Sequence, residues 1–425
     1  DQGAGEPIKG YVAESEHDEA NHIIDEINRL KDEGISTPGD TAIFYRTNAQ
    51  SRVFEESFLR SAIPYKVVGG VRFYERKEVK DFLAYLRVLV NSEDEVSLRR
   101  IINTPKRGIG DRALDTVDLH SKNTGITFWQ ALCDARNVPD VPTRAIASIA
   151  DFVHLIHSLQ TLVEAKTRPS VIAQAVLEQS GLLHELQKSE DPQDESRIEN
   201  LEELVAVALE YEEGEVIEGE EISLLGFLEN VSLVADSDQI PEGEDHGGVV
   251  TMMTLHTAKG LEFPTVFLTG MEEGIFPHSR TLGDKNEIEE ERRLAYVGLT
   301  RARERLYISR SEYRTAWGAP AYNPASRFLA EIPEGVIEWN EHEPSAPRNS
   351  SLTRSANFMP APRATGRKSD STMVLEVGDR VSHDTFGLGS VVAVSGTGDR
   401  AEATINFGSY GEKRLLLRYA PVEKL

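Results

Sequence analysis

Residues 41–91 alternate short apolar segments with amphipathic segments, and this alternation constrains the fold more than any other feature of the chain. Strand-like runs at 41–46 and 64–70 alternate with helix-like runs at 53–63 and 77–91. The order strand, helix, strand, helix is typical of a parallel sheet covered by helices. From 92 to 245 the periodicity becomes mainly helical, which predicts an insertion into the α/β unit.

The alternating pattern then returns. Strand-like runs at 249–255, 264–270 and 305–311 enclose a helix-like run at 286–300. We therefore expect one α/β fold, a parallel sheet that a large all-helical insertion splits in two.

The C-terminal region has a different character. Residues 340–373 are rich in Pro, Ser, Ala and Arg without apolar periodicity, which predicts a disordered linker. From Val374 onward, short β-branched runs separated by glycines indicate a small, strongly bent, all-β barrel. Phe386, Gly387 and Gly389 are expected to shape a strand turn in it rather than to contact a partner.

Composition limits the environment and the class of protein. The 425 residues carry a net charge of -25, so the chain as a whole repels phosphate and any nucleic-acid surface must be local. No run approaches the roughly 18 apolar residues of a membrane span. A single cysteine, Cys133, excludes an intramolecular disulfide, which together with the lack of a secretory signal favours a cytoplasmic setting. We expect Cys133 to be a small core residue, with a disulfide-linked homodimer as the alternative.

Three segments combine polar residues with predicted strand ends. TMMTLHTAKGLEFPTVFLTGMEEGIFP at 251–277 places His256, Thr257, Lys259 and Glu262 between two buried strands. Residues 289–309, EEERRLAYVGLTRARERLYIS, and 42–52, AIFYRTNAQSR, are the others. Because open α/β sheets bind ligands at the carboxyl ends of their strands, these segments predict a binding site.

In this order, the three segments resemble the later motifs of superfamily 1 DNA helicases of the UvrD/PcrA/Rep group. The resemblance implies that residues 1–90 and 246–335 form a second RecA-like motor domain and that 91–245 form a helical domain inserted into it. With the linker that composition predicts placed at 336–373, residues 374–425 resemble the Tudor-like (SH3-like) barrels that end these proteins. The expected function is an ATP-dependent 3′-to-5′ DNA helicase of nucleotide excision repair type, in the bacterial cytoplasm at the nucleoid.

The resemblance assigns nucleotide roles to four residues. Arg46 and Arg301 match the two arginine fingers, whose guanidinium groups stabilise charge on the transferring γ-phosphoryl group. Tyr45 matches the aromatic that stacks on adenine, with a core tyrosine as the alternative. Glu262 matches the carboxylate that accepts a hydrogen bond from the ribose hydroxyl. The alternative is a carboxylate that caps the end of a helix.

Other residues are assigned to DNA. His256 and Thr257 match positions near single-stranded DNA phosphates, and nothing in the spacing of His256 predicts a metal site. Residues 312–329 suit a β-hairpin, and Trp317 aligns with the pin that stacks on the last base pair at the single-strand/double-strand junction; packing on the sheet is the alternative.

NTPKRGIGDRALDTV at 103–117 resembles a helix-hairpin-helix element. Gly108 and Gly110 allow close approach to DNA, and backbone N–H groups ahead of a helix capped by Asp111 can bind a phosphate. Lys106 and Arg107 are expected to add positive charge. A glycine turn without a ligand is the alternative.

No phosphate-binding G-x-x-x-x-G-K-[ST] motif occurs in the chain, which also begins without Met. We therefore expect a C-terminal fragment that does not hydrolyse ATP at a useful rate alone. ATP and Mg²⁺ would be held mainly by an N-terminal motor half. RNA polymerase would bind residues 374–425. A non-enzymatic scaffold for duplex DNA and RNA polymerase is the alternative function, and a helicase–nuclease fusion is disfavoured because the barrel occupies the place of a nuclease.

Overall fold

A computed structural model describes residues 5–214, 222–236, 247–316, 319–333, 335–341, 375–396, 398, 401–420 and 422–425. The expected disordered linker lies largely outside these residues. The described chain forms two compact units, of which the first ends at Glu341 and the second contains the C-terminal strands.

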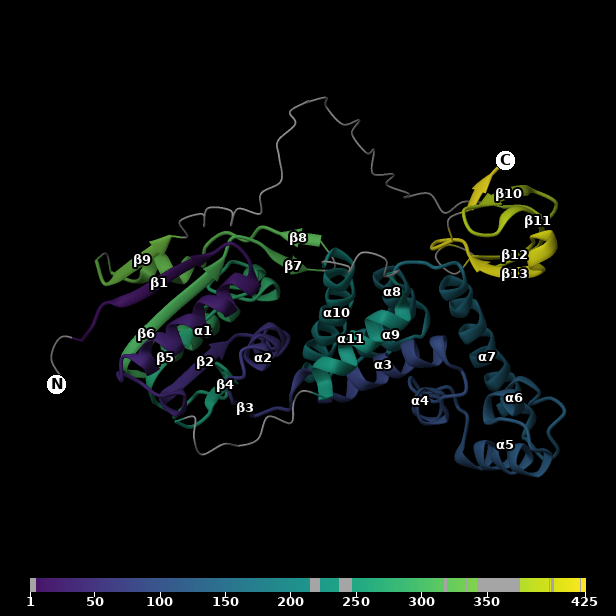
Figure 1. Cartoon of the computed structure of the whole chain (residues 1–425), viewed down its shortest axis with the longest axis horizontal. Helices are drawn as coiled ribbons and strands as arrows, with labels where there is room; N and C mark the ends of the chain where they lie inside the picture. Colours follow the sequence, from purple (N-terminus) through teal and green to yellow (C-terminus); the bar gives the residue numbers. More distant parts are fainter. Residues whose placement is uncertain are drawn as a thin grey trace. The chain divides into compact units, whose positions relative to one another are not determined.

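A seven-stranded sheet forms the centre of the first unit, with every strand pair parallel (Figure 1). The strand order is β3-β4-β2-β5-β6-β1-β9. The strands are β1 (Ile8–Ala13), β2 (Thr41–Tyr45), β3 (Tyr65–Val68), β4 (Val250–Thr254), β5 (Phe263–Leu268), β6 (Ala302–Ser311) and β9 (Ile337–Glu341). The pairing of β2 with β4 and β5 joins segments that the insertion separates in sequence, which confirms the split α/β fold.

Helices cover both faces of this sheet. Ile43 and Tyr45 of β2 pack with α1 (Glu16–Asp32) and α2 (Ser51–Arg60) on one face. Ala42 and Phe44 pack on the other, with Ala295 of α12 (Lys285–Leu299). Because both faces are covered, every residue of β2 is buried.

The inserted part is helical, as expected, with the helices α3 (Lys77–Val90), α4 (Glu95–Ile101), α5 (Asp111–Thr124), α6 (Phe128–Cys133), α7 (Thr143–Glu164), α8 (Pro169–Gln179), α9 (Leu182–Gln187), α10 (Pro192–Glu213) and α11 (Leu224–Asp236). The prediction that α3 covers the sheet is wrong, because α3 packs on α4, α8, α10 and α11. The insertion therefore begins before residue 91.

Helix α7 alone, among the helices that the structure describes, is long and apolar enough to pass a length-and-composition test for crossing a membrane. Its residues Ile149, Phe152 and Ile156 are at most 1% exposed in the fold, as in a core helix of a globular protein, which passes the same test.

The end of the first unit also differs from the expectation. β9 pairs with β1, from Ile8↔Ile337 to Val12↔Glu341, so these residues belong to the sheet rather than to a linker that begins at 336. The hairpin of β7 (Arg314–Ala316) and β8 (Ala319–Ala321) is formed as predicted.

The second unit is a five-stranded antiparallel sheet of order β13-β12-β11-β10-β14, which confirms the small all-β module. Its strands are β10 (Arg380–His383), β11 (Gly387–Ser395), β12 (Glu402–Asn406), β13 (Glu412–Leu416) and β14 (Val422–Lys424). Phe386 is buried and packs on Phe407. A Cβ on Gly389 would lie 2.6 Å from both Ile405 and Phe407, so this position needs glycine. These contacts agree with the structural role expected for the turn.

Candidate functional site

Polar residues gather where β2 and β4 end, as predicted. Arg46 follows β2, and His256 and Thr257 follow β4. The backbone N–H of Leu255 donates to the carbonyl of Tyr45 at 2.9 Å, so the two loops lie side by side at the carboxyl edge of the sheet.

Arg46 forms a bidentate ion pair with Glu291 of α12. Its Nε lies 3.0 Å from each carboxylate oxygen, and its Nη2 lies 2.7 Å from Oε1. Only 18% of the Arg46 side chain and 5% of the Glu291 side chain are exposed. Gln50 fixes the backbone here, because its Oε1 accepts from the N–H groups of Arg46 and Thr47 at 2.9 Å each. Arg46 is thus held in a defined orientation by a forked acceptor.

His256 is exposed beside this pair. Partial burial and the positive charge of Arg46 lower its pKa, and the charges of Glu291 and Glu290 only partly oppose this. The imidazole is therefore neutral at pH 7 and can donate or accept a hydrogen bond. The hydroxyl of Thr257 lies 3.0 Å from that of Thr254 and next to Gly69, which follows β3.

Arg301 lies at the opposite edge of the sheet, immediately before β6. Its Nε donates to the carbonyl of Val297 at 3.1 Å and its Nη2 to the hydroxyl of Thr300 at 3.0 Å. Glu262, which is 55% exposed on its side chain, approaches Nη1 to 3.9 Å. The structure therefore brings Arg301 and Glu262 together.

The structure does not bring Arg46 and Arg301 together on one acceptor. Because β2, β5 and β6 run parallel, the residue after β2 and the residue before β6 lie at opposite edges. Both guanidinium groups nevertheless contact α12, Arg46 at Glu291 and Arg301 at Val297. Six residues of helix separate these contacts, or about 9 Å along the axis.

Tyr45 is fully buried in the core between the sheet and α1 and α2. Burial raises its pKa, and the charge of Glu55 adds to this shift. Side chains alternate along a strand, so Tyr45 points to the face opposite that of Arg46. The structure supports the alternative of a core tyrosine, and stacking on adenine stays a prediction.

Arg107 of the helix-hairpin-helix segment is anchored by several hydrogen bonds within the insertion. Its guanidinium donates to the Tyr85 hydroxyl at 2.6 Å, the Ser180 carbonyl at 2.8 Å and the Ile101 carbonyl at 2.9 Å, and it also contacts the carbonyls of Ile102, Thr104 and Pro105. The Arg107 guanidinium thus satisfies carbonyls at the end of α4, which lack intrahelical partners, and its expected contribution of positive charge to a DNA-binding surface stays a prediction.

The other residues of this segment remain accessible. Lys106, Gly108 and Gly110 are exposed, and Gly108 has a φ of 73°. Gly110, rather than Asp111, is the N-cap of α5, and no side chain caps that end. The backbone N–H groups of the first turn are thus not occupied by a capping side chain, which is the arrangement expected for phosphate contact.

The predicted positions of Trp317 and Cys133 have different outcomes. Trp317 lies outside the described residues. Cys133 is exposed, which corrects the prediction of a core residue; partial burial of the thiol and the charge of Glu93 raise its pKa to about 11.

The raised pKa makes Cys133 a slow nucleophile. At pH 8 we expect its reaction with a disulfide reagent to be about 100-fold slower than that of a thiol of pKa about 8.5, because only the thiolate attacks. Stopped-flow measurement with and without urea tests this, since unfolding restores the ordinary pKa. Equal rates in the folded and unfolded chain would contradict it.

Sequence reasoning missed Glu291 and Gln50. The signal for Glu291 was present, because Ile288, Glu291, Ala295 and Gly298 form the buried face of α12 at helical spacing. A carboxylate on an apolar face needs a partner.

A cavity of about 430 Å³ adjoins the loop that follows β2. Its other walls are formed by residues of α10, the segment 274–280 and the β7–β8 hairpin. Glu202 lines it, and burial together with the charge of Glu199 raises the pKa of Glu202 to about 8, although Arg280 opposes the shift.

This pKa predicts a dependence of stability on pH. The folded chain holds a proton on Glu202 that the unfolded chain releases near pH 4.5, so stability falls as the pH rises from about 4.5 to about 8. Glu202→Gln should remove the decrease in stability that comes from Glu202, and it should make the chain more stable at pH 8. Urea unfolding from pH 5 to 8.5 measures it, and parallel curves for both chains would contradict it.

Comparison with known families identifies the class. Residues 1–313 match the UvrD-like helicase C-terminal domain, and the chain belongs to this family. Residues 377–424 match the PcrA/UvrD tudor domain.

The chain is similar in sequence to individual helicases of this family. The chain is 51% identical to the ATP-dependent DNA helicase UvrD1 of Mycobacterium tuberculosis over 445 residues, covering 100% of this chain and 56% of the relative. It is 48% identical to UvrD1 of Mycobacterium leprae, covering 100% and 57%, and 39% identical to the ATP-dependent DNA helicase PcrA of Bacillus subtilis, covering 99% and 57%. The chain thus spans little more than half the length of these relatives.

Proposed function

We propose that this chain is the C-terminal part of an ATP-dependent 3′-to-5′ DNA helicase that acts in DNA repair in the cytoplasm. The names of the relatives support the helicase activity. The observation that carries the proposal in the structure is the bidentate Arg46–Glu291 pair at the carboxyl edge. A carboxylate and a phosphoryl group present the same forked acceptor, which supports the proposal that a γ-phosphate replaces Glu291 as the partner of Arg46.

The nucleotide would lie between this chain and an N-terminal motor half that binds ATP and Mg²⁺. Arg46 would exchange Glu291 for the γ-phosphate, and Arg301, which has only weak contacts at Nη1, would swing toward the same group. Glu262 beside Arg301 would accept from the ribose. The two guanidinium groups contact α12 about 9 Å apart along its axis, so the triphosphate would have to lie against α12 to be reached by both.

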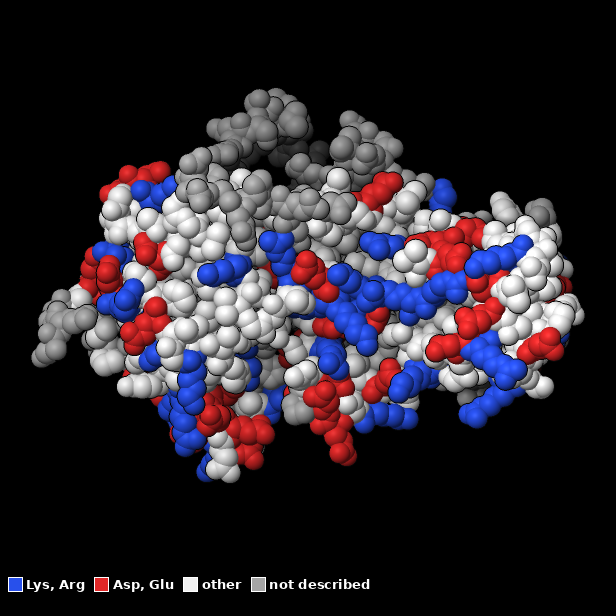
Figure 2. All heavy atoms as spheres, turned by 90° about the horizontal axis from the view of Figure 1, so that it is seen from below, with Lys and Arg blue, Asp and Glu red and all other residues white. Residues whose placement is uncertain are grey.

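DNA would follow the basic surfaces of the chain. Figure 2 shows Lys and Arg side chains gathered over the helical insertion on one face. The exposed basic residues of α3 and α4 are Lys77, Lys80, Arg87, Arg99 and Arg100. Together with Lys106, Gly108 and Gly110 they would contact the phosphates of duplex DNA. His256 and Thr257 would contact the single strand. The Tudor-like module would bind RNA polymerase.

Hydrolysis by the joined halves tests the proposal. Alone, the chain should hydrolyse no ATP above background; with the N-terminal half it should show DNA-stimulated hydrolysis and unwind a duplex with a 3′ single-stranded tail. Robust hydrolysis by the chain alone would contradict the proposal that the N-terminal half is needed to bind and hydrolyse ATP. Binding of duplex DNA by joined halves that never hydrolyse ATP would instead support a scaffold.

A further inference from the structure

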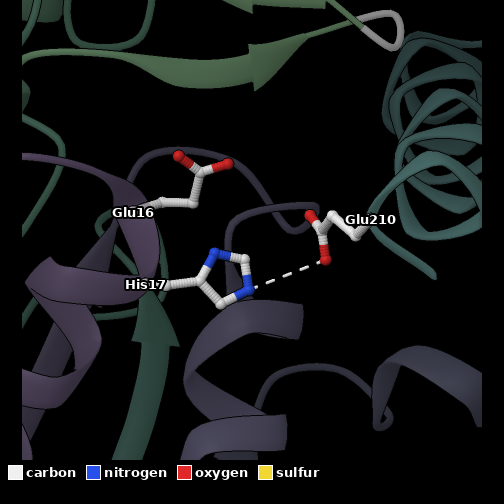
Figure 3. A group of neighbouring side chains, drawn as sticks. All are labelled: Glu16, His17 and Glu210. Carbon is white, nitrogen blue, oxygen red and sulfur yellow. Dashed lines mark ion pairs between the residues drawn. The ribbon is translucent and has the colours of Figure 1, made fainter. Parts of the chain in front are cut away.

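Three potential metal ligands meet where the insertion contacts the α/β part of the first unit. Glu16 and His17 lie in the first turn of α1, and Glu210 lies near the end of α10. One ligand atom from each residue lies within 4.8 Å of the others, and Nε2 of His17 is 3.6 Å from Oε2 of Glu210. Figure 3 shows the three side chains around a common space. We propose that they bind a divalent transition-metal ion.

Glu16 supplies the independent indication of a ligand. The residue is 6% exposed. Its Oε1 accepts from the backbone N–H of Thr315 at 2.9 Å, whereas its Oε2 is buried without a hydrogen-bond partner among the described residues. A buried carboxylate oxygen without a donor is unfavourable, and a cation bound to Glu16 would satisfy it.

The charge around the site is also unbalanced. Arg52, which is 1% exposed, contacts Glu56, Glu203 and Glu210. Arg314 contacts Glu19 and Glu272, and its charge also acts on Glu16. Arg76 also acts on Glu203, so three guanidinium groups face the six carboxylates named here, and negative charge remains in excess. A divalent ion would offset this excess.

The donor set selects the kind of ion. An imidazole nitrogen with two carboxylate oxygens suits Zn²⁺ or Mn²⁺, whereas Mg²⁺ and Ca²⁺ prefer oxygen donors alone. The hydrogen bonds from Arg52 to both oxygens of Glu210 leave each oxygen a second lone pair and would orient it as an outer-shell donor does. Of the three ligands, Glu16 lines the cavity of about 430 Å³, so water can approach the site from that side.

The metal would tie α1 of the α/β part to α10 of the insertion and so stabilise the observed arrangement of these helices. Zn²⁺ titration of the chain by calorimetry, in a Cys133→Ser background that removes the thiol, tests the site. We expect one site that Glu16→Gln or His17→Asn weakens by at least about tenfold, since even outer-shell partners change metal affinity by that much.

Matched controls are Glu14→Gln and His184→Asn, which alter exposed residues outside the cluster and should leave the affinity unchanged. Gln at position 16 keeps an acceptor for Thr315, and His17 is 34% exposed on its side chain, so at least the second variant should fold. Mn²⁺ electron paramagnetic resonance gives a second readout of the bound ion. No saturable binding, or equal Zn²⁺ affinity in the His17→Asn chain, would overturn the proposal. The test requires no ATP hydrolysis and is independent of the proposed function.

Discussion

Replacing Arg46 or Arg301 by alanine in the joined two-part protein should lower kcat for ATP hydrolysis by about 10³- to 10⁵-fold, the range measured for arginine fingers. In-line transfer to water spreads negative charge over the γ-phosphoryl oxygens, and no other side chain presents two parallel N–H donors to them. Because each arginine already has a defined place on α12, its removal should change the chemical step far more than the fold.

Steady-state hydrolysis with saturating single-stranded DNA measures this effect. Lysine at either position should restore only a small part of the rate, because an ammonium is a point charge without the fork. Arg293→Ala is the matched control: this residue also lies on α12, is 74% exposed on its side chain and pairs only with the exposed Glu290 among the contacts described. A loss of less than tenfold for both finger variants would exclude their assigned role.

Replacing Arg314 by methionine should lower the free energy of unfolding of the chain by about 3–5 kcal/mol, the usual cost of removing one partner from a buried ion pair. Nε of Arg314 lies 3.0 Å from each oxygen of Glu272, and Nη2 contacts Glu19. Burial opposes ionisation of Glu272, yet the charge of Arg314 holds the pKa of that carboxyl below its usual value. Without the guanidinium, two carboxylates that are at most 1% exposed would remain close together.

Urea unfolding followed by tryptophan fluorescence and circular dichroism measures the loss. Arg327→Met is the control, since this arginine also pairs with a glutamate, Glu273, but is 44% exposed on its side chain. Exposed pairs contribute about 0–1 kcal/mol, so the control should unfold close to the unmodified chain. Similar losses for both variants would show that burial of the Arg314 network is not the cause.

Periodicity predicted most elements of the fold but not all of their partners. β2 was evident because a run of apolar residues with polar ends is typical of a strand covered on both faces. The partner of α3 was assigned wrongly, since an amphipathic helix has the same pattern on a sheet as on other helices. β9 was missed because five residues with the sequence IEWNE carry too weak a pattern beside a Pro- and Ser-rich segment.

The sequence by itself determined the α/β class, the helical interruption, the C-terminal β module and the positions of Arg46, His256 and Arg301 beside strands, because these depend on local periodicity and on motifs. The tertiary structure decided which side chains meet. Arg46 and Glu291 are 245 residues apart, and Glu16 meets Glu210 only because α10 packs against the α/β part. Such contacts depend on the packing of whole elements, and no local pattern encodes the distance between two side chains that the chain brings together from so far apart.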